Sequence, residues 1–115
     1  MVYAALQTGV DGLFFWSHYA ADPTWRSTVF APLMSEVHPV LPAVEAGRVG
    51  SVRPSSPQVT ATLFRDPGTK RFVLIAVNNG GTQVSTTIVL PRRLLRTGRR
   101  LAVKLAGFGA RVARF

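Results

Sequence analysis

The 115-residue sequence contains no cysteine and only five acidic residues, and both shortages narrow what the chain can be. The lack of cysteine excludes a disulfide framework and a thiolate metal site, although it leaves the compartment undecided. No apolar run approaches the roughly 20 residues that span a bilayer. The first residues also lack the basic region and long apolar core of a secretory signal. Hydrophobic residues make up 47% of the chain, which is enough for a packed core.

Acidic residues are also unevenly placed. All five lie within residues 1–66, where four arginines leave a net charge of −1, whereas residues 67–115 hold ten bases and no acid. A basic block of this kind can attract nucleic acid or another anionic surface. However, its bases are not interleaved with the aromatic residues on which single-stranded nucleic acid stacks. The pattern therefore makes nucleic acid an unfavoured partner. The alternative explanation of the basic block is an arginine-rich composition together with acidic partner surface that lies outside this chain.

The most informative stretch is residues 9–19. Its apolar centre at residues 13–16 follows Gly9 and Gly12 and is succeeded at once by Ser17, His18 and Tyr19. A continuous apolar run bounded by turn signals is typical of a strand buried on both faces, as in a parallel sheet covered by helices. Polar residues at the carboxyl end of such a strand occupy the place where α/β enzymes hold their ligands. We therefore expect one wall of an active site here.

Helical signals flank this predicted strand. Residues 2–8 read as the last turns of a helix that ends at Gly9. Asp22 and Pro23 suit the N-cap and first position of a second helix, whose apolar residues recur at helical spacing as far as residue 44. Three prolines, at positions 32, 39 and 42, predict that this helix is kinked or segmented. Gly47 and Gly50 are expected to end this second helix.

From residue 51 the pattern changes to that of short strands. Residues 51–57 have the composition of a linker. Alternating segments at 58–65, 71–77, 83–90, 99–105 and 110–115 are separated by turns, including Asp66-Pro67-Gly68-Thr69, where proline presets φ and glycine is expected to supply a positive φ. These strands predict an antiparallel meander that forms a small sheet or sandwich. Because both chain ends fall inside predicted elements, we expect both to be cut.

Two parts of the sequence resemble a known enzyme group. The run YAALQTGVDGLFFWSHY at residues 3–19 resembles the last strand of the (β/α)8 barrel in many glycoside hydrolases, including β-galactosidase-like and cellulase-like enzymes. The region from Trp25 to Pro42 resembles the last barrel helix, and the β-rich part resembles the β-sandwich that often follows such barrels. The resemblance implies a mixed α and β fold in three parts. Residues 1–50 would be the last βα unit of an incomplete TIM-type barrel, 51–57 a linker, and 58–115 a truncated antiparallel β-sandwich domain.

The resemblance also implies which residues touch substrate. A tryptophan at the position of Trp16 floors the sugar-binding cleft in those barrels, because an indole face stacks on the apolar face of a sugar. His18 and Tyr19 follow it and could hydrogen-bond the substrate. The alternative for Trp16 is a core tryptophan, and for His18 and Tyr19 it is a locally satisfied loop.

Catalytic residues are not expected in this chain. Glycoside hydrolysis normally needs two carboxylates, which the resemblance places upstream of Met1. Asp11 lies toward the N-terminal end of the predicted strand, which in a barrel contributes to stability rather than catalysis. Asp22 suits a helix cap, and Glu36 and Glu45 fall along the predicted helix. No cofactor is predicted. Neither is a metal site, because His18 and His38 lie on different elements without ligand companions.

The resemblance thus implies a C-terminal fragment of a glycoside hydrolase whose partners are carbohydrate, through the complete parent enzyme, and the missing barrel portion. No membrane partner is predicted. One alternative is a non-catalytic carbohydrate-binding or structural β-sandwich module, and a second is a basic nucleic-acid-binding protein. The phenylalanines of the β-rich part alternate like core residues, which favours a structural sandwich; they are Phe64, Phe72, Phe108 and Phe115.

Overall fold

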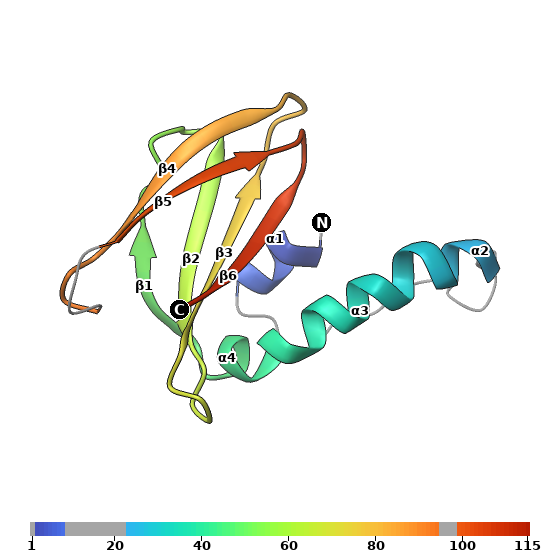
Figure 1. The fold of residues 1–115 in the computed structure, drawn as a ribbon, viewed down its shortest axis with the longest axis horizontal. Coiled ribbons are helices and arrows are strands. Elements are labelled where there is room, and N and C mark those ends of the chain that lie inside the picture. The colour runs from blue at the N-terminus through green and yellow to red at the C-terminus, as the bar shows by residue number, and fades with distance from the viewer. Residues whose placement is uncertain (1, 9–22, 95–98) are drawn as a thin grey trace.

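A helical layer covers one face of a two-sheet β-sandwich (Figure 1). The computed structural model describes residues 2–8, 23–94 and 99–115. The predicted strand at 9–19, with Trp16, His18 and Tyr19, and the predicted cap at Asp22 lie outside these residues. The helical elements are α1 (Val2–Gln7), α2 (Pro23–Trp25), a π-helical segment η2 (Arg26–Phe30), α3 (Ala31–Val37), a 3-10 segment η3 (His38–Val40) and α4 (Leu41–Glu45).

Residues 23–45 form one long helix that changes its hydrogen-bonding pattern near the prolines. Pro32 follows the π-helical segment, at whose end the Ala31 N–H donates to the Arg26 carbonyl five residues earlier. Pro39 lies in the 3-10 segment and Pro42 in the first turn of α4. Proline lacks an N–H and cannot continue a regular α-helical ladder. The predicted segmentation of this helix is therefore confirmed, as is its end at Gly47, which has a φ of 90°.

The six strands within the described residues make two antiparallel sheets, which confirms the mixed α and β class with antiparallel strands. One sheet has the order β1-β2-β3-β6 and the other pairs β4 with β5. The chain is a meander only through β1, β2 and β3, because it then crosses to the second sheet and returns. The strands are β1 (Arg48–Val52), β2 (Val59–Arg65), β3 (Phe72–Asn78), β4 (Val84–Leu90), β5 (Arg99–Leu105) and β6 (Ala110–Arg114).

Strand β1 is the element that sequence reasoning missed. The sequence pattern predicts a helix end at Gly50 and a linker from residue 51, yet residues 48–52 pair with β2 through a register shift next to Gly50. Glycine weakens a strand pattern and often marks such a bulge. Beyond β1, Pro54 forms an isolated bridge with Ile88, so this segment is fastened to both sheets.

Two apolar cores lie on opposite faces of the four-stranded sheet. The first fills the sandwich and includes Leu63 and Leu74 from one sheet and Ile88, Leu90 and Val103 from the other. Residues of the second core alternate with those of the first along β2 and β3, as the two-residue period of a strand requires. This second core joins Phe64, Val73, Ile75 and Val77 to the helical residues Leu6, Val37, Val40, Ala43 and Val44.

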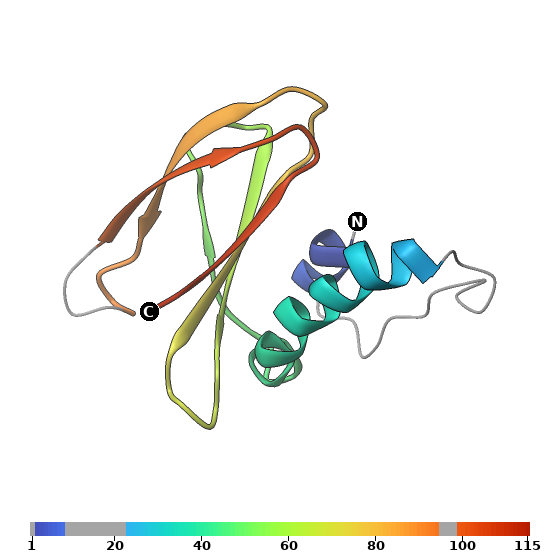
Figure 2. The same ribbon diagram turned by 45° about the vertical axis from the view of Figure 1, so that its right-hand side comes forward.

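The helical layer therefore packs directly on the sheet, opposite β4 and β5 (Figure 2). Gln7 at the end of α1 adds polar contacts: its side-chain amide donates to the backbone carbonyls of Thr60 and Ile75, at 3.0 and 2.8 Å. The Thr60 hydroxyl donates back to the Gln7 amide oxygen at 2.9 Å. The division of the chain into a barrel unit, a linker and a sandwich stays a prediction.

Candidate functional site

The predicted substrate-binding residues Trp16, His18 and Tyr19 lie outside the described residues, so their placement stays a prediction. The segment that carries them joins α1 to α2. Shortly after that segment in the sequence, Trp25 and Phe30 form an aromatic pair, whose rings stack with centroids 5.7 Å apart. Trp25 is 37% exposed and Val29, four residues later on the same helix face, is 47% exposed. This end of the long helix therefore presents an apolar surface.

The described carboxylates have separate structural settings. Glu36 and Glu45 are exposed on the helical layer. Asp66 begins the β2–β3 turn, where its Oδ1 accepts hydrogen bonds from the backbone N–H groups of Gly68 and Thr69, at 2.8 and 3.2 Å. These two bonds lower the pKa of Asp66 and keep it ionised, and the bond from the Thr69 N–H has the larger effect. An acid held in this state is unsuited to donate a proton near neutral pH.

That turn differs from its prediction in one detail. The positive φ is at Lys70, with a value of 61°, rather than at Gly68. The Lys70 N–H donates to the Asp66 carbonyl at 2.9 Å, which closes the turn four residues after it begins. Asp66 thus fixes the turn through both its side chain and its backbone.

Tyr3 brings a buried hydroxyl to the junction of α1 and α3. Its phenol oxygen makes no hydrogen bond within the described part of the chain. Burial raises the pKa of the Tyr3 hydroxyl, and the neighbouring Glu36 carboxylate, which lies outside hydrogen-bonding geometry, raises it further. The hydroxyl therefore remains protonated.

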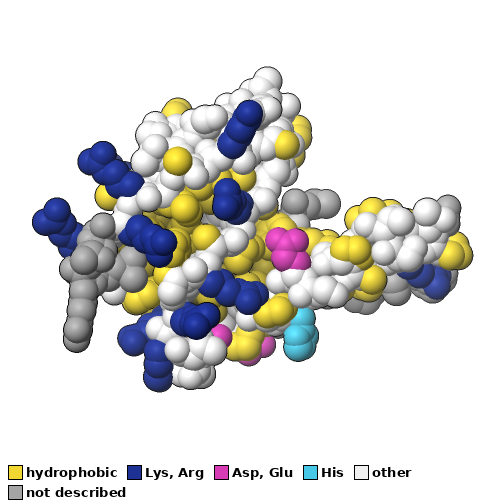
Figure 3. Space-filling model, viewed as in Figure 1, with side chains coloured by type: hydrophobic (Ala, Val, Ile, Leu, Met, Phe, Trp, Pro, Cys, Tyr) yellow, Lys and Arg dark blue, Asp and Glu magenta, His cyan; other side chains and the backbone are white. Residues whose placement is uncertain are grey.

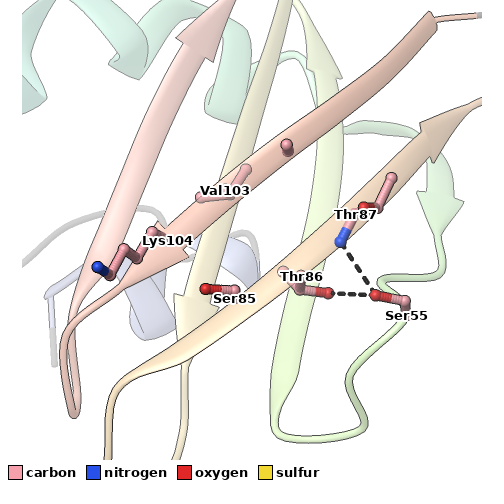
Figure 4. Close-up of a pocket in the computed structure, with 7 residues that line it drawn as sticks. Ser55, Ser85, Thr86, Thr87, Val103 and Lys104 are labelled. Atoms are coloured by element: carbon pink, nitrogen blue, oxygen red, sulfur yellow. Dashed lines mark hydrogen bonds between the residues drawn. The ribbon is translucent and has the colours of Figure 1, made fainter.

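A shallow groove of about 250 Å³ lies where β4 and β5 meet the segment before β2 (Figure 4). Ser55 organises its floor: the Ser55 hydroxyl lies 3.1 Å from that of Thr86 and accepts the Thr87 N–H at 3.0 Å. Ser85 and Lys104 complete the polar lining, and they are cross-strand partners in the β4–β5 register. The groove thus combines several hydroxyl groups with one ammonium group.

A second hollow, of about 330 Å³, lies between α1 and the end of β3 and is lined by Ala4, Val77, Asn78, Asn79 and Phe108. Phe108 is 71% exposed and has a φ of 55°. Its N–H donates to the Gly80 carbonyl at 2.8 Å. The preceding Gly107 lies so close to Gly81 that a Cβ there would overlap the Gly81 backbone. The chain therefore holds a phenyl ring outward in a backbone conformation that disfavours side chains.

This placement corrects the interpretation of the phenylalanines as a uniform core set. Phe64 is fully buried in the second core. Phe72 and Phe115 are partly buried against the first, each beneath a guanidinium: Arg65 over Phe72 and Arg99 over Phe115. Phe108 is the exception, and its glycine neighbours at 107 and 109 were the signal that a turn, rather than a strand face, carries it.

Basic side chains spread over the face that carries β4, β5 and β6 (Figure 3). From residue 46 onward the sequence contains thirteen bases and one acid, Asp66. All the bases of this part that the structure describes are exposed: Arg48, Arg53, Arg65, Lys70, Arg71, Arg92, Arg93, Arg99, Arg100, Lys104, Arg111 and Arg114. The uneven charge of the sequence is thus a property of the sandwich surface.

Within the described ranges, no three histidine, cysteine or acidic side chains come together as metal ligands. The helices among the same residues are also too short or too polar to cross a membrane. Comparison of the chain with protein-family models, curated proteins and solved structures gives no match.

Proposed function

We propose that the chain is the C-terminal part of a barrel-type glycoside hydrolase, in which Trp16, His18 and Tyr19 line the sugar cleft and other parts of the enzyme supply the catalytic carboxylates. In this proposal the long helix is the last helix of the barrel, and the sandwich is an accessory domain packed on it.

The observation that carries the proposal is the position of the long helix. Its α4 end packs into the second core through Ala43 and Val44, whereas its α2 end extends past the sheet (Figure 1). At that end Trp25 and Val29 expose one apolar helix face. An outer helix of a (β/α)8 barrel buries such a face against the neighbouring strands and helices. The α2 end has the surface that this arrangement requires.

The carboxylates support the same proposal. Glycoside hydrolysis uses two carboxyl groups roughly 5–10 Å apart. In the described part of the chain Asp66 is committed to a turn, while Glu36 and Glu45 are exposed on the helical layer. Hydrolysis would therefore depend on acids contributed from outside this set.

The test is an assay of the purified chain against aryl glycosides of several sugars. We expect no turnover above a blank purification, because the two-carboxylate machinery would be incomplete. Turnover that copurifies with the chain and changes with substitution of its own acids would contradict the proposal.

A second candidate, non-catalytic carbohydrate binding by the sandwich, is favoured by Phe108. An exposed ring beside the Asn79 amide offers both stacking and hydrogen bonding to a sugar. Retention of the chain on a neutral polysaccharide, lost in Phe108→Ala, is the expected result if this function operates. If neither the parent chain nor Phe108→Ala is retained on the polysaccharide, this function is excluded.

A further inference from the structure

The outer face of the β4–β5 sheet carries exposed polar groups as well as charge. Alternate residues of β4 and β5 point into the sandwich core, among them Ile88, Leu90, Val103 and Leu105, so their neighbours point outward. The outward residues pair across the two strands as Ser85 with Lys104, Thr87 with Ala102, and Val89 with Arg100. This face therefore has a cation near each end. Ser85 lies beside Lys104, Thr87 lies between the two cations, and the exposed apolar Val89 lies beside Arg100.

The Ser85–Lys104 pair is the centre of this face. Both residues are exposed, and they lie directly opposite each other in the register. Cross-strand partners have Cβ atoms about 5 Å apart, which lets one oxyanion contact both side chains. Neither side chain hydrogen-bonds to another described residue, whereas the adjacent Ser55, Thr86 and Thr87 groups are already linked to one another. The pair thus has its hydrogen-bond donors available above a pre-organised floor.

We propose that this face binds an acidic polysaccharide, with Lys104 and Arg100 contacting the anionic groups of the chain and Ser85 and the Ser55–Thr87 floor contacting its hydroxyls. Ammonium and guanidinium groups form the stronger, charge-assisted hydrogen bonds with carboxylate oxygens. The neutral Ser85 and Thr87 hydroxyls, one beside Lys104 and one between the two cations, match a polymer whose charges are separated by uncharged polar groups.

Two features favour a polysaccharide over nucleic acid. Binding of single strands requires exposed aromatic faces, but the outward residues of β4 and β5 include no aromatic ring. The exposed Phe108 lies in the β5–β6 turn beside Asn79, outside this face. A two-stranded ribbon can read duplex DNA by entering the major groove, but here the inner side of β4 and β5 is packed against the other sheet. Only the outer face of the two-stranded sheet is therefore accessible, and the ribbon cannot enter a major groove with both of its faces.

The experiment compares binding of polygalacturonate to the 115-residue chain and to two double variants, measured by calorimetry in about 50 mM salt, where charge contacts are weakly screened. Arg100→Gln/Lys104→Gln removes two charges from the proposed face. Lys70→Gln/Arg71→Gln removes two exposed charges from the β2–β3 hairpin and is the matched control. We expect about tenfold weaker binding for the first variant, because it removes both exposed charge contacts of the proposed face, and less than a twofold change for the second.

Ser85→Ala provides a further test, since it alters no charge and removes only an exposed hydroxyl group. We expect it to weaken binding by about threefold, in proportion to a neutral hydrogen bond. Equal losses in the two double variants would overturn the proposal in favour of diffuse charge attraction. No binding of polygalacturonate by the parent chain, or tighter binding of duplex DNA, would also overturn it. These results are independent of the aryl glycoside assay, because the cleft and this face are different surfaces.

Discussion

Gln7 and Thr60 exchange hydrogen bonds between the first helix and the second strand, 53 residues apart in the sequence. The Gln7 amide nitrogen donates to the Thr60 carbonyl, and the Thr60 hydroxyl donates to the Gln7 amide oxygen. The same nitrogen also reaches the Ile75 carbonyl. A glutamine that is 8% exposed satisfies its polar atoms through the sheet on which its helix packs. This pair fastens the N-terminal helix to the β-rich part.

Replacement of Gln7 by leucine should lower the free energy of unfolding by about 2 kcal/mol, because the buried Ile75 carbonyl and the partly buried Thr60 groups lose their partner. Thr8→Ala is the control, since Thr8 is exposed and its hydroxyl donates only to the Ala5 carbonyl in the last turn of α1. Its expected change is below about 0.5 kcal/mol. Urea unfolding of the three proteins measures both values. Equal stability of the Gln7→Leu variant and the parent would show that the α1–sheet contact contributes nothing.

Removal of the helical layer should prevent the sandwich from folding by itself. Residues 48–115 alone would expose Phe64, Val73, Ile75 and Val77, which the helices now cover. An apolar patch of this kind promotes association or loss of structure. We expect the 48–115 fragment to be aggregated or to lack a cooperative thermal transition. A monomeric fragment with dispersed amide resonances and a sharp transition would show that the sandwich is an independent domain.

Phe108 and Phe64 should respond in opposite ways to truncation. Phe108→Gly should leave stability unchanged or raise it by about 1 kcal/mol, because glycine accepts the positive φ that phenylalanine adopts under strain. Phe64→Ala should lower stability by about 3–5 kcal/mol, since Phe64 is fully buried. Thermal or urea unfolding distinguishes the two. A large destabilisation by Phe108→Gly would mean that the exposed ring has a structural role.

Asp66 should make the stability of the β2–β3 turn depend on pH. Its folded pKa is lowered by the hydrogen bonds from Thr69 and Gly68. The stabilisation is therefore fully present above the unfolded pKa of about 3.9 and is lost as pH falls through the lower folded pKa. The parent should melt at a higher temperature than Asp66→Ala at about pH 7, and the difference should shrink toward about pH 2.

Asp66→Asn is the matched control, because an amide oxygen can still accept the turn hydrogen bonds but does not titrate. The gap in melting temperature between Asp66→Asn and Asp66→Ala should stay constant over this pH range. If the difference in melting temperature between the parent and Asp66→Ala is also constant over this pH range, the role assigned to the ionised carboxylate is contradicted.

Much of the secondary structure follows from local sequence signals. The strands predicted at 58–65, 71–77 and 83–90 begin within one residue of Val59, Phe72 and Val84. Alternation of side chains and turn residues determines such limits locally. The pairing of β6 with β3, and the bonds from Gln7 to the sheet, join residues far apart in the chain, so local patterns contain no information about them. Strand β1 was missed because Gly50 and its bulge interrupt the alternation.

The candidate sites show the same limit. The excess of bases after residue 66 was visible in the sequence, but the opposition of Ser85 and Lys104 depends on the β4–β5 register. Phe108 resembled a core residue by its type, and its exposure became clear from the turn that carries it. The proposed cleft residues lie in a segment whose placement the structure does not describe, so their role depends on the resemblance.

The DNA sequence upstream of Met1 tests the central proposal most directly. We expect an uninterrupted reading frame that extends at least about 200 residues upstream, enough for the remaining units of a barrel, and that encodes two carboxylates at the ends of predicted strands. An in-frame stop codon immediately upstream of Met1, followed by a translation start signal, would contradict it.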